Sequence, residues 1–155
     1  MIDATVELGA PLPNWKLAPL TNEKIPDLKT YLGKPLLIVI FNLGCPGCLG
    51  RALPFANRMV VEKGENISVL GIHSSFEGIP LSDQKLISAK EEFFIRFPYF
   101  RDQNEMSSFK LFQAGGTPHW LLVDQFGNLA YSIFGSDPNN ALLRLDLKIS
   151  ELLEE

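Results

Sequence analysis

The chain has little cysteine, because its 155 residues include only Cys45 and Cys48, both in the motif Cys45-Pro46-Gly47-Cys48. A small domain stapled by disulfides carries cysteine at a much higher density. A disulfide between these two residues would close so short a loop that it would hardly restrict the unfolded chain. The pair therefore indicates redox chemistry or metal binding rather than a structural cross-link.

Long hydrophobic runs and blocks of positive charge are also lacking. The longest apolar run, Leu36 to Phe41, falls far short of the ~20 residues that a membrane helix needs. Lys and Arg number 14 against 18 Asp and Glu, and the net charge of −4 argues against binding to phosphate backbones. We therefore expect neither a membrane nor a nucleic acid as a partner.

The first residues, Met1 to Glu7, have neither the basic segment nor the apolar segment of a signal peptide. A chain that starts at Met1 is therefore expected to be cytoplasmic. No repeat, low-complexity segment or long linker divides the sequence, and 155 residues suffice for one hydrophobic core. We expect a single domain over residues 1–155, with residues 1–34 as an irregular, proline-punctuated extension packed on it.

The C-x-x-C motif lies between a predicted strand and a predicted helix. The strand, Leu36–Phe41, is apolar throughout, which is typical of a central strand buried on both faces. The helix is expected from about Pro46 to Lys63, because proline is favourable in a first turn and Gly64 can end the helix. Pro54 should kink this helix.

The rest of the chain predicts an α/β fold with a central mixed sheet flanked by helices on both faces. Trp15 and Leu17 are expected in one strand of a small N-terminal hairpin. The last two strands are expected to form an antiparallel hairpin around the turn residues 124–128. The remaining elements are expected as strands at 66–73, 98–102, 120–123 and 129–134, and as helices from Ser82 to about Phe94, from Glu105 to Phe112 and from Pro138, with Asp137 as its N-cap.

Several segments of the sequence resemble the thioredoxin-like superfamily. Within it, the chain is similar to the branch of TlpA/ResA-like thiol–disulfide reductases, which borders on the peroxiredoxins. The matching segments are Gly9-Ala10-Pro11-Leu12-Pro13, Gly33-Lys34-Pro35-Leu36-Leu37-Ile38, Cys45-Pro46-Gly47-Cys48, Val69-Leu70-Gly71-Ile72-His73-Ser74, Gly116-Thr117-Pro118 and Val123-Asp124-Gln125-Phe126-Gly127-Asn128-Leu129. The resemblance implies a thioredoxin-like fold with a helix and a strand inserted between Cys48 and Pro118, and a cis Pro118 that faces the cysteines.

The sequence departs from this family at four positions. Gly44 replaces the aromatic residue that often precedes the first cysteine, and Val39 replaces the buried acid of simple thioredoxins. Arg51 stands where the reductase branch often has glutamate. Pro54 follows Cys48 by six residues instead of five. These departures leave the group that moves protons undefined.

The roles of the site residues follow from the motif and from the resemblance. Cys45, at a helix N-terminus where free N–H groups favour an anion, is expected to attack the substrate disulfide, and the more buried Cys48 is expected to resolve the intermediate. The resemblance implies that Pro118 exposes the backbone of Thr117 for pairing with a substrate. His73 and His119 are candidates for proton transfer, although an isolated histidine more often has no such role.

Three other interpretations remain open. The first is a thiol peroxidase, but peroxiredoxins carry Thr or Ser three residues before the reactive cysteine, where this chain has Asn42. The second is a zinc site of Cys45, Cys48, His73 and His119, although structural zinc ligands usually come in local pairs. The third is a module of thioredoxin fold that binds zinc or a partner protein without turnover. For the preferred interpretation, an oxidoreductase, we expect no metal or other cofactor. For an oxidoreductase, the expected partners are a disulfide-bearing protein or small thiol and an upstream reductant, with the protein a monomer or weak dimer.

Overall fold

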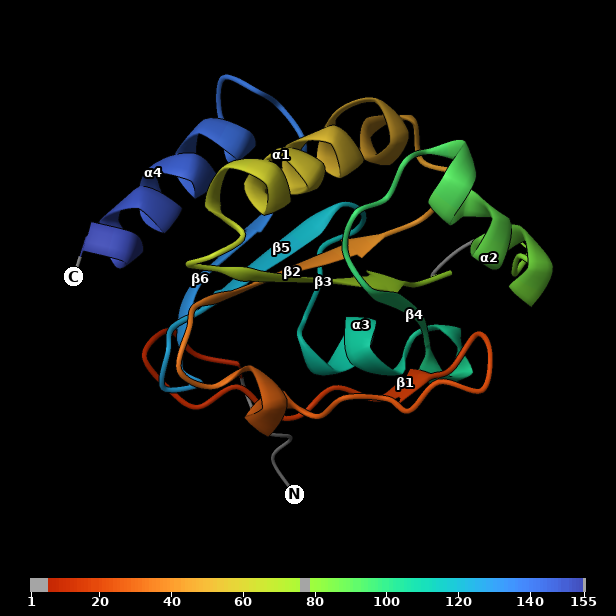
Figure 1. Ribbon diagram of the computed structural model, residues 1–155, viewed down its shortest axis with the longest axis horizontal. Coiled ribbons are helices and arrows are strands. Elements are labelled where there is room, and N and C mark those ends of the chain that lie inside the picture. Colours follow the sequence, from red (N-terminus) through yellow and green to blue (C-terminus); the bar gives the residue numbers. More distant parts are fainter. Residues whose placement is uncertain (1–5, 76–78, 155) are drawn as a thin grey trace.

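The computed structural model describes residues 6–75 and 79–154, which form an open mixed sheet with helices on both faces (Figure 1). Within these residues the strand order is β1-β4-β3-β2-β5-β6. The strands are β1 (Leu17–Ala18), β2 (Leu36–Phe41), β3 (Ser68–His73), β4 (Tyr99–Asp102), β5 (His119–Val123) and β6 (Leu129–Phe134). The α-helices are α1 (Leu53–Lys63), α2 (Asp83–Glu92), α3 (Ser107–Leu111) and α4 (Ala141–Glu154). The predicted α/β fold, with a central mixed sheet flanked by helices, is confirmed.

Strand β2 lies in the middle of the sheet, parallel to β3 and antiparallel to β5. All six of its residues are buried, as its unbroken apolar sequence predicts. Its alternate side chains enter two cores. Leu37, Val39 and Phe41 pack on the side of α1 and α4, whereas Leu36, Ile38 and Ile40 pack on the side of α3 and the N-terminal segment.

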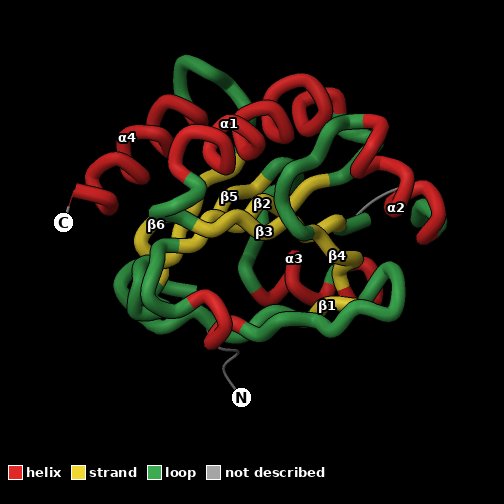
Figure 2. The backbone as a smooth tube through the Cα atoms, viewed as in Figure 1, coloured by secondary structure: helices red, strands yellow, loops and turns green. Residues whose placement is uncertain are grey.

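The N-terminal segment covers the face of the sheet opposite α1 and α4, largely as loop (Figure 2). Leu12 and Trp15 are buried there, and the Trp15 indole donates to the carbonyl of Pro26 at 2.8 Å. The predicted hairpin is wrong, because β1 pairs antiparallel with the free edge of β4. Pro19 follows β1 directly and cannot donate a ladder hydrogen bond, so the strand ends after two residues.

The helix after the motif begins at Pro46 and ends before Gly64, as predicted, but it contains one π-turn at Cys48–Ala52. The Leu53 N–H donates to the carbonyl of Cys48, five residues earlier. Because a π-turn holds one residue more than an α-turn, it takes up the extra residue between Cys48 and Pro54. Pro54 lies directly after this π-turn, within the helix that continues from Pro46 to Lys63.

The other helix boundaries differ modestly from the prediction. Ser82 caps α2 as expected, accepting from the N–H of Lys85 at 3.2 Å. The last helix starts at Ala141 rather than at Pro138, because the Asp137 carboxylate accepts from the N–H of Asn139 and closes a separate turn. Helix α3 starts at Ser107 rather than at Glu105, since Asn104 and Glu105 have positive φ angles of 51° and 68°, which α-helix excludes. Of the described helices, none combines the length and apolar character of a membrane span.

Candidate active site

The two cysteines lie where β2 passes into the π-turn, and both thiols are free. Cys45 is partly exposed, whereas Cys48 is fully buried behind it. The N–H of Cys48 donates to the Cys45 sulfur at 3.3 Å, and the Cys45 thiol donates to the carbonyl of Thr117 at 3.4 Å. A Cys45 thiolate would keep the first of these bonds, because an N–H donor stabilises negative charge on sulfur.

The chemistry of Cys48 is set by its burial. Burial, and then the hydrogen bond with Cys45, raises the pKa of the Cys48 thiol to about 12. Cys48 is therefore a thiol at neutral pH and cannot compete as the first nucleophile, since the thiolate is the reactive form. To act as a nucleophile, Cys48 would first have to lose its proton.

Asn42 fixes the turn that leads into Cys45. Its side-chain oxygen accepts from the N–H of Gly44 at 2.7 Å, and its backbone carbonyl accepts from the N–H of Cys45 at 3.1 Å. Its side-chain amide donates to the carbonyl of Ser74, the residue after β3, at 2.9 Å. The Cys45 turn is thus anchored to the neighbouring strand end as well as to itself.

His73 supports the same turn from behind. It is fully buried at the end of β3, its Nε2 accepts from the N–H of Leu43 at 3.1 Å, and its ring meets Phe41 edge-on at 5.3 Å. Burial, and then the positive charge of Arg101, lowers the pKa of His73 to about 4. The ring is therefore neutral at pH 7 and acts here as a hydrogen-bond acceptor for the backbone. Its role in proton transfer stays a prediction.

His119 holds the loop that faces Cys45 from the other side. Its Nδ1 accepts from the N–H of Gly115 at 3.2 Å, and its Nε2 lies 2.8 Å from the hydroxyl oxygen of Ser132. Burial lowers the pKa of His119 to about 4. Both ring nitrogens are thus engaged away from the cysteines, and proton transfer by His119 also stays a prediction.

These two histidines predict a loss of stability in mild acid. Unfolded histidine takes up a proton near pH 6.5 and the folded rings only near pH 4, so the unfolded state binds more protons between these values. The free energy of unfolding should therefore fall as the pH drops from 7 to 4, by about 3 kcal/mol for each histidine.

Urea unfolding at pH 7, 5.5 and 4.5 measures this slope. His119→Asn and His73→Gln keep an acceptor near the original nitrogen but cannot be protonated, so each should flatten the slope. Burial raises the pKa of the Asp102 carboxyl group, so this group increases the free energy of unfolding as the pH falls, opposite to the histidines. The slope of each variant is therefore compared with that of the wild type. Equal slopes in wild type and variants would contradict the assignment.

Thr117 and Pro118 stand opposite the cysteines, just before β5. The peptide bond between them is cis. Thr117 is partly exposed next to Cys45, and Pro118 is buried. The backbone of Thr117 therefore borders both the Cys45 sulfur and open space.

The structure also adds a contact that sequence patterns did not predict. A Cβ atom added to Gly47, between the cysteines, would lie 2.6 Å from the hydroxyl oxygen of Ser136. Ser136 follows β6 and is far from the motif in sequence, so no local signal points to it. The second position inside the C-x-x-C therefore has little space for a side chain unless Ser136 moves.

The four residues of the alternative zinc site do not gather as ligands. Over residues 6–75 and 79–154, no cluster of three or more Cys, His, Asp or Glu side chains is placed to hold a metal ion. His73 accepts a hydrogen bond from Leu43 and His119 lies between Gly115 and Ser132, as described above.

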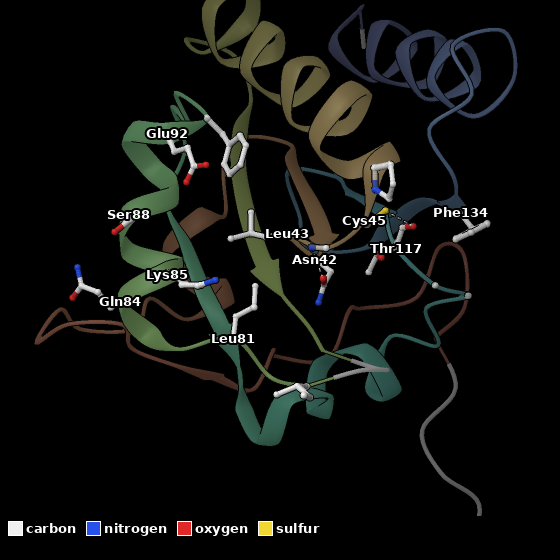
Figure 3. Close-up of a pocket in the computed structure, with 16 residues that line it drawn as sticks. Asn42, Leu43, Cys45, Leu81, Gln84, Lys85, Ser88, Glu92, Thr117 and Phe134 are labelled. Carbon is white, nitrogen blue, oxygen red and sulfur yellow. Dashed lines mark hydrogen bonds between the residues drawn. The ribbon is translucent and has the colours of Figure 1, made fainter.

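A groove of about 880 Å³ opens in front of Cys45. Cys45 and Thr117 lie on one side of it and helix α2 on the other, with Leu43 and Leu81 between them (Figure 3). The lining residues are Asn42, Leu43, Gly44, Cys45, Pro46, Ile79, Leu81, Gln84, Lys85, Ser88, Glu92, Phe93, Gly115, Gly116, Thr117 and Phe134. Sequence patterns identified α2 as a helix but did not associate it with the cysteines, because the contact joins distant segments.

A thioredoxin-like fold with a C-x-x-C pair beside a cis proline defines the class of this protein, and its neighbours among solved structures are thioredoxin-like superfamily proteins. It is similar to a thioredoxin-like superfamily protein of known structure, with 27% identity, a TM-score of 0.82, and 94% of this chain and 97% of the other covered. A thiol-disulfide isomerase from Corynebacterium glutamicum gives 26% identity and a TM-score of 0.82 with the same coverage.

A third solved structure, of a thioredoxin-like protein in its oxidised form, shares the fold at 20% identity with a TM-score of 0.81, over 96% of this chain and 98% of the other. No protein-family model and no curated protein sequence matches the chain. The resemblance predicted from the sequence motifs is thus confirmed by the structural comparison.

Proposed function

We propose that this protein is a thiol–disulfide oxidoreductase in which Cys45 attacks the substrate and Cys48 resolves the intermediate. The observation that carries the proposal is the placement of the two sulfurs. Cys45 is partly exposed in the groove and receives the N–H of Cys48, whereas the Cys48 thiol is buried behind it. The similarity to a thiol-disulfide isomerase supports the same class of reaction.

The cycle has two exchange steps. The Cys45 thiolate attacks one sulfur of a substrate disulfide, so that a Cys45–substrate disulfide forms and the other substrate sulfur leaves as a thiolate that takes up a proton. Cys48 then loses its proton and attacks the Cys45 sulfur. The internal disulfide forms, and the second substrate thiolate leaves. Two electrons have passed to the substrate, and an upstream dithiol must return them.

The partners proposed for this cycle are a disulfide-bearing protein or small thiol and that reductant. The backbone of Thr117 is the proposed contact for an extended substrate segment, because it lies beside the Cys45 sulfur at the border of the groove. In a reducing compartment such as the cytoplasm, the expected location, the cycle runs as a reductase.

The peroxidase alternative gains no support from Asn42. Both ends of its side-chain amide are bonded within the protein, to Gly44 and to Ser74, so the group is not presented for binding peroxide. Consumption of hydrogen peroxide by the purified protein measures this alternative directly.

Trapping with Cys48→Ser tests the proposed mechanism. Without the resolving thiol, the Cys45–substrate disulfide should persist, and its yield should exceed that of the wild type by at least about tenfold, because intramolecular attack normally clears it quickly. Non-reducing gels and mass spectrometry measure the adducts, which dithiothreitol should release.

The double variant Cys45→Ser/Cys48→Ser is the control for adducts formed elsewhere. Equal yields from the single and the double variant would show that Cys45 is not the attacking residue. Persistent adducts on a Cys45→Ser variant instead would reverse the two roles.

A further inference from the structure

Helix α2 turns two opposite charges toward the groove. Lys85 and Glu92 both line it, and Figure 3 shows their side chains extending from α2 toward the space that Leu43 and Leu81 border. Both residues are exposed, and neither makes a salt bridge with another residue of the described chain. Two charges without partners, directed into a substrate groove, are available to a bound molecule.

The charges lie at a fixed separation along the groove. Lys85 and Glu92 are seven residues apart, which is nearly two helical turns and about 10.5 Å along the axis. An extended peptide advances about 3.3 Å per residue and its alternate side chains share one face, so side chains four positions apart, about 13 Å, can both face α2 within reach of its two long charged side chains. A peptide with an acidic and a basic side chain four positions apart can therefore meet both charges when it runs in one direction.

The surface between the charges is apolar. Leu43 and Leu81 lie in the middle of the groove in Figure 3, and Phe93 lines it as well. On the opposite side, Cys45 and Thr117 present the sulfur and a backbone edge. The groove thus offers a reacting thiol, an apolar contact and an ordered pair of charges to one bound segment.

We propose that α2 selects protein disulfides by charge order, favouring a reacting cysteine that has an apolar neighbour and lies between an acidic and a basic residue four positions apart. This inference rests on the proposed function, whose Cys45 attack it uses. Charges at the rim of a binding site act mainly on the rate of association, and salt weakens them. The selection should therefore appear in the second-order rate constant at low salt.

Two peptides with the cores Asp-Cys-Leu-Ala-Lys and Lys-Cys-Leu-Ala-Asp test the proposal, because their two charges share one face of an extended strand and the cysteine lies on the other. Each peptide has its cysteine joined to 5-thio-2-nitrobenzoate. In the Cys48→Ser protein, the Cys45 thiolate attacks the peptide sulfur. A Cys45–peptide disulfide forms, the original S–S bond breaks, and the nitrobenzoate thiolate leaves and is measured by its absorbance. The peptides share composition and net charge, so only the order of the charges differs.

One charge order should react about three- to tenfold faster at low ionic strength, and the difference should shrink in 0.5 M salt. Exchanging the two charges on α2 with Lys85→Glu/Glu92→Lys should invert the preference between the two peptides. The matched control is Lys90→Glu/Glu91→Lys, which makes the same exchange on α2 at exposed positions outside the groove lining, and it should keep the preference of the wild type.

Equal rates for the two peptides, or a preference that survives the reversal of Lys85 and Glu92, would overturn the proposal. An inversion in the control variant would assign the effect to the overall charge of α2 instead, which also overturns it. Failure of the proposed function looks different, because then neither peptide would release nitrobenzoate by way of Cys45.

Discussion

A Cys45→Ser variant should lose disulfide reduction by at least about 1,000-fold, because a serine hydroxyl neither ionises at neutral pH nor forms a disulfide. The remaining thiol, Cys48, cannot take over. It is fully buried, and its raised pKa of about 12 leaves almost no thiolate at pH 7. Reduction of an insulin-type protein disulfide, with dithiothreitol as the final reductant, measures the loss.

The control for this experiment is a Cys48→Ser protein in a single-turnover assay. Its first exchange step should continue, although its steady-state turnover should stop. Thermal unfolding of both variants shows whether either has lost its fold. We expect both to stay folded, because exchanging sulfur for oxygen is a small change. A Cys45→Ser protein that still reduces disulfides at more than about one tenth of the wild-type rate would disprove the assigned nucleophile.

An Asn42→Leu variant should be the next most damaging change to the chemistry. Leucine has a similar size but can neither accept from the N–H of Gly44 nor donate to the carbonyl of Ser74. The turn that holds the Cys45 sulfur beside Thr117 and the Cys48 N–H would then lose its anchor. We expect disulfide reduction to slow by about 10- to 100-fold, since a small displacement of a reacting atom has an effect of this size.

The matched control is Asn57→Leu. Asn57 lies on α1, is also half-buried, and also bridges two backbone groups, the N–H of Arg96 at 2.9 Å and the carbonyl of Phe94 at 3.0 Å. Both variants should lose about 1–3 kcal/mol of unfolding free energy, but only Asn42→Leu should slow reduction well below the melting temperature. The alkylation rate of Cys45 by iodoacetamide adds a second readout. Equal slowing in the two variants would reduce Asn42 to a purely structural role.

The parts of this site that sequence could predict are those encoded by neighbouring residues. The apolar run of β2, the C-x-x-C at the start of a helix, and the Ser82 cap each act within one or two turns of the chain, and the structure contains all three. The thioredoxin-like class followed from motifs of the same local kind. Pro118 was placed near the cysteines through the resemblance alone.

The parts that sequence could not predict arise where distant segments meet. The edge of β4 accepts β1 because no other described strand covers it, and neither segment contains that information alone. Ser136 limits the space at Gly47 across 89 positions, and α2 forms a groove wall opposite Cys45. The histidines illustrate the same limit, since burial and backbone donors, rather than the cysteines, determine their contacts.

The π-turn at Cys48–Ala52 controls the rotational phase of everything that follows it in α1. An added residue in an ordinary α-helix turns all later side chains by about 100° around the axis. Leu53, Phe55, Ala56 and Met59 would then leave the core that they share with α4. Because the widened turn absorbs that rotation within five residues, the dithiol end of the helix can hold one more residue while the packed end keeps its face. A helix of the same fold without such a turn would align with α1 only after a one-residue gap before Leu53.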